Sequence, residues 1–175
     1  MDLRIQRTRK CITDAFVEIR KKKELEKITV KEIADAAMIN KATFYNHFSS
    51  VYDLSEQLEN EVINAVLCDI QPSAWLTGEG TRKMATIMFE KEDIFSTLFS
   101  GNRYSALAYK LEEKIKQLIY QYRPEYQNNI EKDIVLTTMI HGCFHATAKY
   151  RNLDVPRAIE TIAHINDCLI KEFNL

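Results

Sequence analysis

Residues 28–54, ITVKEIADAAMINKATFYNHFSSVYDL, decide the fold of this chain. Thr29 and Glu32 have the spacing of a capping box, in which each side chain bonds to the backbone N–H of the other residue, so a helix is predicted to follow Thr29. Asn40 is a favourable N-cap for another helix. The two predicted helices cover residues 30–37 and 41–47. Two short helices joined by a tight turn are typical of a helix-turn-helix motif.

Longer helices are predicted on both sides of this motif. Residues 3–22 have apolar side chains at helical spacing, and Ser49 or Ser50 is suited to cap a fourth helix over residues 51–71, which Pro72 ends. The apolar side chains of the motif are Ile33, Ala34, Ala37, Ile39, Phe44, Phe48 and Leu54. We expect them to lock the two short helices onto the flanking helices, so that all four share one core.

The remainder of the chain is also predicted to be helical. Its 175 residues contain only four Gly and three Pro, too few for a protein of many strands, which needs frequent turns. Further helices are predicted over residues 81–89, 93–100, 103–122, 129–150 and 156–173, with one loop over residues 73–80. The expected fold class is therefore all-α. Residues 1–50 are expected to form a helix-turn-helix domain, and residues 51–175 a helical body linked to it by residues 51–71.

The net charge of −1 conceals an uneven distribution of charge along the chain. Residues 1–55 hold eleven Lys and Arg against eight Asp and Glu, whereas the remaining residues hold thirteen against seventeen. The first two turns of the first helix contain Arg4, Arg7, Arg9 and Lys10. Cations at a helix N-terminus oppose the helix dipole unless an anion lies nearby. A phosphate backbone would be such an anion.

The third helix is predicted to present polar side chains on its outer face. These residues are Lys41, Ala42, Thr43, Asn46 and His47, with Tyr45 alongside. Side chains of these types read base edges or bind phosphates in DNA complexes. The alternative is an ordinary helical hairpin whose polar face meets water, which composition alone does not exclude.

The same stretch closely resembles the helix-turn-helix of the tetracycline-repressor (TetR) family of bacterial transcription regulators. The resemblance rests on the Thr29 cap, the pair Ile33-Ala34, Ala37, the run from Ala42 to Tyr45, the pair His47-Phe48 and the pair Asp53-Leu54. It covers about the first seventy residues, because the first helix fits the family as well. The resemblance implies a DNA-binding regulator.

The resemblance also implies a role for each residue of the motif. Lys41, Ala42 and Thr43 would lie near bases in the major groove, helped by Lys31. Tyr45 and His47 would contact phosphates, with Thr29 and Asn40 as further backbone contacts and Asn46 on the same outer face. The chain departs from the family twice, because Met38 replaces the usual turn glycine and Val51 replaces a lysine that contacts phosphate.

Apolar and aromatic residues in the body are candidates for an effector pocket, which the resemblance leads us to expect. The candidate residues are Met84, Met88, Phe89, Phe95, Phe99, Tyr104, Leu107 and Phe144. A cleft lined by Met and aromatic side chains would suit an apolar or aromatic effector. The alternative is that most of these residues form a plain packed core.

The last two helices carry more apolar surface than a small body needs, so we expect them to pair with a second copy in a four-helix bundle. The candidate interface residues are Thr138, Met139, Gly142, Ile162, Ile165, Asn166 and Leu169. His141 and His145 share a helix face, but no further ligand is evident from the sequence, so an interface is favoured over a metal site. The expected assembly is a homodimer.

The expected function is an effector-responsive transcriptional repressor that binds a palindromic operator in double-stranded DNA as a homodimer. The alternative is a helical co-regulator that acts through protein–protein contacts, which Val51 and the modest positive charge of residues 1–55 favour. The sequence contains neither GxSxG nor HExxH, so no enzyme is expected. No metal or cofactor is expected either.

A cytoplasmic location is expected, without contact with a membrane. The first residues are charged where a signal peptide needs an apolar run, and no stretch approaches 18 apolar residues. The four cysteines, Cys11, Cys68, Cys143 and Cys168, lie far apart and are expected to be separate thiols.

Overall fold

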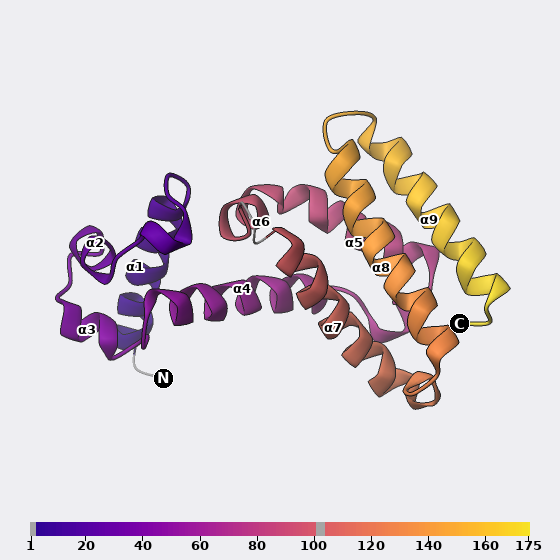
Figure 1. Cartoon of the computed structure of the whole chain (residues 1–175), viewed down its shortest axis with the longest axis horizontal. Coiled ribbons are helices and arrows are strands. Elements are labelled where there is room, and N and C mark those ends of the chain that lie inside the picture. The colour runs from indigo at the N-terminus through magenta and orange to yellow at the C-terminus, as the bar shows by residue number, and fades with distance from the viewer. Residues whose placement is uncertain (1–2, 101–103) are drawn as a thin grey trace. The chain divides into compact units, whose positions relative to one another are not determined.

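The computed structural model describes residues 3–100 and 104–175, and every regular element within these ranges is a helix (Figure 1). The α-helices are α1 (Leu3–Arg20), α2 (Val30–Ala36), α3 (Lys41–Tyr45), α4 (Val51–Leu67), α5 (Gly78–Glu90), α6 (Glu92–Leu98), α7 (Tyr104–Tyr122), α8 (Ile130–Tyr150) and α9 (Val155–Glu172). Short 3-10 helices include η1 (Leu25–Lys27), η2 (Pro72–Ala74) and η4 (Pro124–Tyr126). The predicted all-α class is confirmed.

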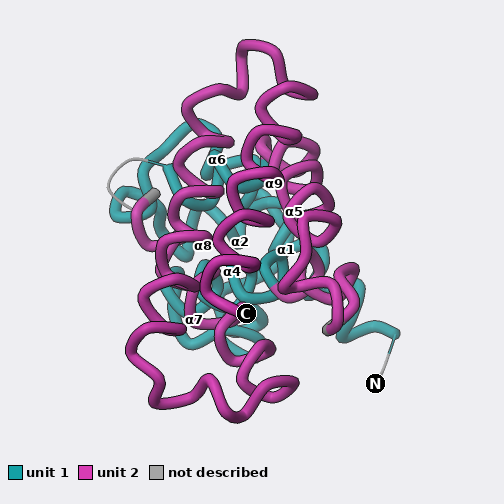
Figure 2. Tube along the Cα trace, turned by 90° about the vertical axis from the view of Figure 1, so that its right-hand side faces the viewer, with its two compact units in different colours: residues 1–63, 94–102 teal, residues 64–93, 103–175 magenta. Residues whose placement is uncertain are grey.

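The chain divides into two compact units, which Figure 2 shows in different colours. Unit 1 comprises Met1–Ile63 and Ile94–Asn102, and unit 2 comprises Asn64–Asp93 and Arg103–Leu175. The division falls inside α4, so most of that helix is grouped with the helix-turn-helix rather than with the body. Most of α6 is also grouped with unit 1, which the sequence-based boundary after residue 50 did not anticipate.

The core of unit 1 consists of aromatic and branched side chains that are at most 1% exposed. They include Ile12 and Phe16 of α1, Ile33 of α2, Phe44 of α3, and Phe48, which precedes α4. Burying a side chain of this size contributes about 1.5–3 kcal/mol. Helices as short as α2 and α3 are not stable alone in water, so this core is what holds them in place.

Unit 2 is a helical body in which α9 packs against α5 and α8, and α8 packs against α7 (Figure 1). Helix α5 begins at Gly78, earlier than the predicted residue 81, because the Thr77 hydroxyl caps it by accepting a hydrogen bond from the Gly80 N–H at 3.1 Å. A Cβ atom at Gly80 would lie 1.9 Å from the Ala74 carbonyl oxygen, so this close approach requires glycine. The predicted loop over residues 73–80 is therefore shorter than expected, and Trp75 within it is buried.

A polar network joins α7 to α8. Glu112 accepts hydrogen bonds from Lys116 and Thr137 at 2.8 and 2.7 Å, and its other oxygen lies 2.8 Å from His141 Nε2. These hydrogen bonds outweigh the opposing effect of burial and lower the pKa of Glu112 to about 2. Lys116 also bonds to Asp133 at 2.6 Å, which helps to raise its pKa. His141 is thus held by a carboxylate, and no cluster of three metal-ligating side chains occurs among the described residues.

Candidate nucleic-acid interface

Helix α2 begins with the predicted capping box. The Thr29 hydroxyl accepts a hydrogen bond from the Glu32 N–H at 3.3 Å, and the Thr29 N–H donates to the Glu32 carboxylate at 3.0 Å. Lys23 also pairs with Glu32, and these contacts lower the pKa of that carboxyl, with the bond from Lys23 as the largest cause. The ionised carboxylate lies in the first turn of α2, where a negative charge stabilises the helix dipole.

Helix α3 begins with the predicted Asn40 cap. Asn40 Oδ1 accepts hydrogen bonds from the Thr43 N–H at 2.7 Å and from the Thr43 hydroxyl at 3.0 Å. The cap uses the amide oxygen of Asn40 and leaves its N–H groups available to a phosphate oxygen. The start of α3 is therefore ordered in the free protein. Ligand binding does not have to supply the free energy of ordering it.

The turn between α2 and α3 closes around Met38. Its φ is 54°, in the left-handed region that favours glycine. The Ile39 N–H bonds to the Ala34 carbonyl at 2.9 Å and the Met38 N–H bonds to the Asp35 carbonyl at 3.2 Å, which together form a Schellman motif. The Met38 side chain is 92% exposed, so no packing offsets the unfavourable backbone conformation.

The nine predicted DNA-contacting residues lie on the surface of α2 and α3 and of their caps. Thr29, Lys31, Asn40, Lys41, Ala42, Tyr45 and Asn46 are exposed, whereas Thr43 and His47 are partly buried. The buried Phe44 ring meets the Tyr45 ring edge-on, with centroids 5.6 Å apart. The described part of the chain offers no ion pair to Lys31 or Lys41, so both cations remain available to an external anion.

Val51 is the first residue of α4 and is only 7% exposed. This departure from the family therefore adds an apolar residue to the core of unit 1. The N-terminus of α4 is instead capped by serine and aspartate. The Ser50 hydroxyl accepts from the Asp53 N–H at 3.0 Å, and the Asp53 carboxylate accepts from the Ser49 N–H at 2.7 Å. Hydrogen bonds from Gln57 and Ser49 lower the pKa of Asp53, so it is ionised at neutral pH.

Arg9 plays a structural part that the sequence did not reveal. Its guanidinium lies 5.0 Å from the centroid of the Phe48 ring and donates hydrogen bonds to Gln57 at 3.0 Å and Glu61 at 2.6 Å. It therefore ties α1 to α4, rather than serving as one of the cations available to phosphate. Lys10 is likewise paired with Asp14 within α1.

Sequence and structure comparisons point to the same family. Residues 12–58 match the model of the bacterial regulatory proteins of the tetR family, a range that spans the second half of α1, all of α2 and α3, and the start of α4. The N-terminal part of the chain thus matches the TetR family of bacterial regulatory proteins, the resemblance that the sequence predicted. No curated protein sequence matches the chain significantly.

Solved structures of the same fold cover nearly the whole chain. The dihydroxyacetone kinase operon activator DhaS is similar with a TM-score of 0.65 and 17% identity, over 94% of this chain and 97% of that one. A tetR-family transcriptional regulator from Streptomyces coelicolor has a TM-score of 0.64 and 12% identity, over 98% and 83%. A TetR transcriptional regulator from Rhodococcus sp. RHA1 has a TM-score of 0.58 and 17% identity, over 94% and 97%. No described helix is long and apolar enough to cross a membrane.

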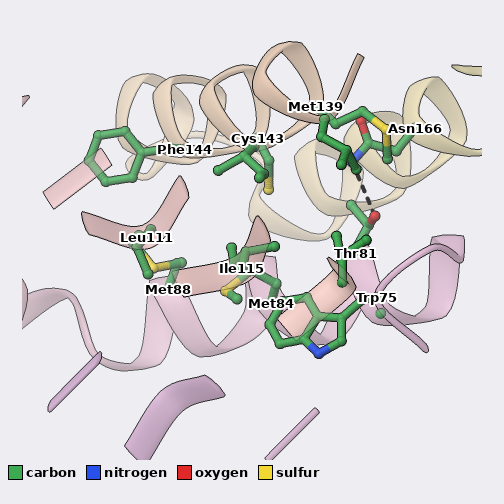
Figure 3. Close-up of a pocket in the computed structure, with 14 residues that line it drawn as sticks. Trp75, Thr81, Met84, Met88, Leu111, Ile115, Met139, Cys143, Phe144 and Asn166 are labelled. Atoms are coloured by element: carbon green, nitrogen blue, oxygen red, sulfur yellow. Dashed lines mark hydrogen bonds between the residues drawn. The ribbon is translucent and has the colours of Figure 1, made fainter. Parts of the chain in front are cut away.

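The body of the chain contains a small apolar cavity, about 60 Å³ in volume (Figure 3). Of the residues predicted for an effector pocket, Met84, Met88 and Phe144 line it. Phe89 and Leu107 do not line this cavity, and Phe95 and Phe99 are buried in α6 and the residue after it, in unit 1. The Tyr104 side chain lies outside the described part of the structure. Sequence reasoning missed Trp75, Thr81, Leu111, Ile115, Cys143 and others, because apolar periodicity does not show which core positions border a void.

The predicted dimer residues separate into two groups. Met139, Ile162 and Asn166 are buried within the protomer, and Met139 and Asn166 line the cavity, so packing inside the protomer already accounts for them. Thr138, Gly142 and Ile165 are exposed, and Leu169 is partly buried. Exposed Ile130 and Ile134 extend the apolar surface of α8. These outward residues of α8 and α9 are available to a partner.

The strained turn yields a prediction. Replacing Met38 with Gly should stabilise unit 1 by about 1 kcal/mol, because glycine adopts positive φ without the steric cost that a Cβ atom imposes. Met38→Ala is the matched control and should give little change, since it keeps the Cβ atom and the lost side chain is exposed. Hydrogen exchange of the Ile39 amide measures the effect within unit 1. Equal exchange rates in both variants would show that the turn is not strained.

Proposed function

We propose that this TetR-family regulator is an effector-responsive repressor that binds a palindromic operator as a homodimer. The observation that carries the proposal is the exposed set of DNA-reading side chains on α3, held on a helix whose one buried side chain, Phe44, anchors it in the core of unit 1. Two unpaired lysines, a capping asparagine with free N–H groups and an exposed tyrosine hydroxyl match the chemistry of bases and phosphates.

Position along α3 separates base contacts from phosphate contacts in this proposal. Lys41 and Ala42 lie in the first turn, the part of a recognition helix that approaches base edges. Lys is a donor for guanine O6 and N7, and the Ala42 methyl suits the methyl group of thymine. Tyr45 lies one turn later and carries a neutral hydroxyl that suits a phosphate oxygen.

The outward face of α8 and α9 supports pairing of two copies. Ile134 and Ile165 are more than half exposed, although both are large apolar residues. A Cβ atom built at Gly142 would meet nothing within 4 Å in the protomer, so no internal packing explains a glycine there. A small residue does suit close approach of a partner helix. A two-fold dimer would present two α3 helices and so requires an operator with two-fold symmetry.

The position of the cavity in the body supports control of DNA binding by an effector. Its lining comes from α5, α7, α8 and α9, together with Trp75, which caps η2 a short way along the chain after α4. An effector that fits one arrangement of these helices better than another would shift the population of body conformations. Helix α4 continues without a break from unit 2 into unit 1, so a shift of its C-terminal end is a route to the DNA-binding surface.

A co-regulator that acts through protein contacts is a second candidate, favoured by Val51. Burial of Val51 replaces the cation expected at the start of α4 and removes one phosphate contact. Such a protein would show only weak binding to DNA, without preference for sequence.

DNA binding by variants of α3 tests the proposal. Lys41→Ala should cost about 1–3 kcal/mol on the specific operator and much less on scrambled DNA, because a base contact carries sequence information. Tyr45→Phe should weaken binding to both DNAs about equally and leave the salt dependence unchanged, because a neutral hydroxyl displaces no counterion. Gel shifts at two salt concentrations, using DNA upstream of the gene, provide the measurement.

Lys27→Ala is the matched control for loss of positive charge, because Lys27 is exposed in η1 of the same unit but does not belong to α2 or α3. It should leave the preference for the operator intact. Equal weakening of both DNAs by Lys41→Ala would make Lys41 a phosphate contact. Absence of a saturable band for the unmodified chain would favour the co-regulator.

The proposed dimer face gives a further prediction. Ile165→Asp should raise the dimer dissociation constant by about a hundredfold, because burying an unpaired charge costs several kcal/mol and about 1.4 kcal/mol corresponds to tenfold. Tyr122→Asp is the control, since Tyr122 on α7 is exposed to a similar extent, 51% against 53%. Analytical ultracentrifugation measures both variants. If Ile165→Asp dimerises as tightly as the control, the partner does not contact this face of α9.

A further inference from the structure

We infer that the cavity in the body takes a small, uncharged phenol, with its ring among the methionines and its hydroxyl donating to Asn166. The assignment of this ligand as the effector rests on the proposed function, but its binding does not. The argument uses the charge, the hydrogen bonds and the atom types of the lining.

The cavity excludes charged ligands. Its lining consists of Trp75, Gly80, Thr81, Met84, Met88, Leu111, Ile115, Ile119, Leu136, Met139, Ile140, Cys143, Phe144 and Asn166. None of these side chains is a carboxylate, an ammonium, a guanidinium or an imidazole. A carboxylate or an amine buried here would have no charged partner, and this cost would outweigh the gain from burying its apolar part.

At the polar edge of the cavity, one hydrogen-bond acceptor, Asn166 Oδ1, is not used by the described residues. Asn166 Nδ2 donates to the Thr81 hydroxyl at 3.1 Å, and that hydroxyl donates in turn to the Thr77 carbonyl at 3.3 Å (Figure 3). Thr81 therefore uses its proton within the protomer. Asn166 Oδ1 accepts no hydrogen bond from the described residues, and Asn166 as a whole is 7% exposed. A ligand that donates one hydrogen bond would satisfy this oxygen.

The remaining lining favours an aromatic ring. Met84, Met88 and Met139 come from two helices, and Cys143 adds a fourth sulfur atom to the wall. Contacts between sulfur and an aromatic ring contribute about 0.3–1.5 kcal/mol each. Figure 3 shows Met84 and Met88 on one side of the cavity and Cys143 and Met139 on the other.

The size of the cavity limits the ligand to a single ring. Its volume of about 60 Å³ is well below the roughly 150 Å³ of a dry cavity that binds benzene. Methionine is unbranched and flexible, so rotation of these side chains can enlarge the space. One substituted ring is then the upper limit, and entry of the ligand must displace part of the lining.

Titration calorimetry on the full chain with phenol and toluene tests the inference, because the two molecules have nearly the same shape and only phenol donates a hydrogen bond. Asn166→Leu should weaken phenol binding by about tenfold, because it removes the Oδ1 acceptor. It also removes the Nδ2 bond to Thr81. Toluene binding should change within about twofold, because toluene uses neither group. Toluene thus reports whether the variant still has a folded cavity. Benzoate should show no saturable binding to the unmodified chain.

A second measurement uses Cys143 in a chain whose exposed cysteines, Cys11, Cys68 and Cys168, are replaced by serine. Saturating phenol should slow the reaction of the remaining Cys143 thiol with a maleimide. Failure of phenol to bind or to protect Cys143, equal weakening of phenol and toluene by Asn166→Leu, or binding of benzoate would overturn the inference. Gel shifts without phenol are independent of these results, so failure of the ligand and failure of the DNA-binding proposal are distinguishable.

Discussion

The proposed DNA-binding surface of this chain depends on the burial of one side chain, Phe44. Helix α3 has five residues, and a helix of that length does not persist in water on its own propensity. Phe44 is its only fully buried residue, and it lies in a core with Phe16, Ile33 and Phe48. The residues on either side of Phe44 are exposed or partly exposed, so the packing that fixes the helix also determines which side chains it presents.

Helix caps and a few side-chain contacts add to the order that this core gives the helix-turn-helix. The Thr29 capping box, the Asn40 cap and the Schellman turn at Met38 satisfy backbone groups at both ends of α2 and at the start of α3. Arg9 joins α1 to α4 through the face of Phe48 and two hydrogen bonds. These contacts leave little freedom in the motif, and they agree with a surface that is organised before it meets DNA.

The sequence predicted unit 1 well because its signals are local. Thr29 with Glu32, and Asn40 with Thr43, are three residues apart, and the structure places all four in the predicted hydrogen bonds. Arg9 was not predicted, because its partners are about fifty residues away and their positions follow only from the fold.

The body was predicted less well because tertiary packing decides its features. Apolar spacing identified Met139 and Ile162 as residues that need burial, but it could not tell burial within a protomer from burial between two. Asn166 was predicted to lie at the interface, whereas the fold pairs it with Thr81, 85 residues earlier in the chain. Phe95 and Phe99 are aromatic residues of a type that lines pockets, but they lie in the segment grouped with unit 1.

The central claim is that α3, held by Phe44, enters the major groove with its first turn against the bases. Disulfide trapping tests this most directly, using Ala42→Cys in a chain whose exposed cysteines are replaced by serine, and operator DNA carrying a thiol tethered in the major groove. The account predicts efficient trapping at one symmetric pair of positions, and none when the thiol is tethered in the minor groove. Trapping with equal efficiency along the DNA, or in the minor groove alone, would contradict it.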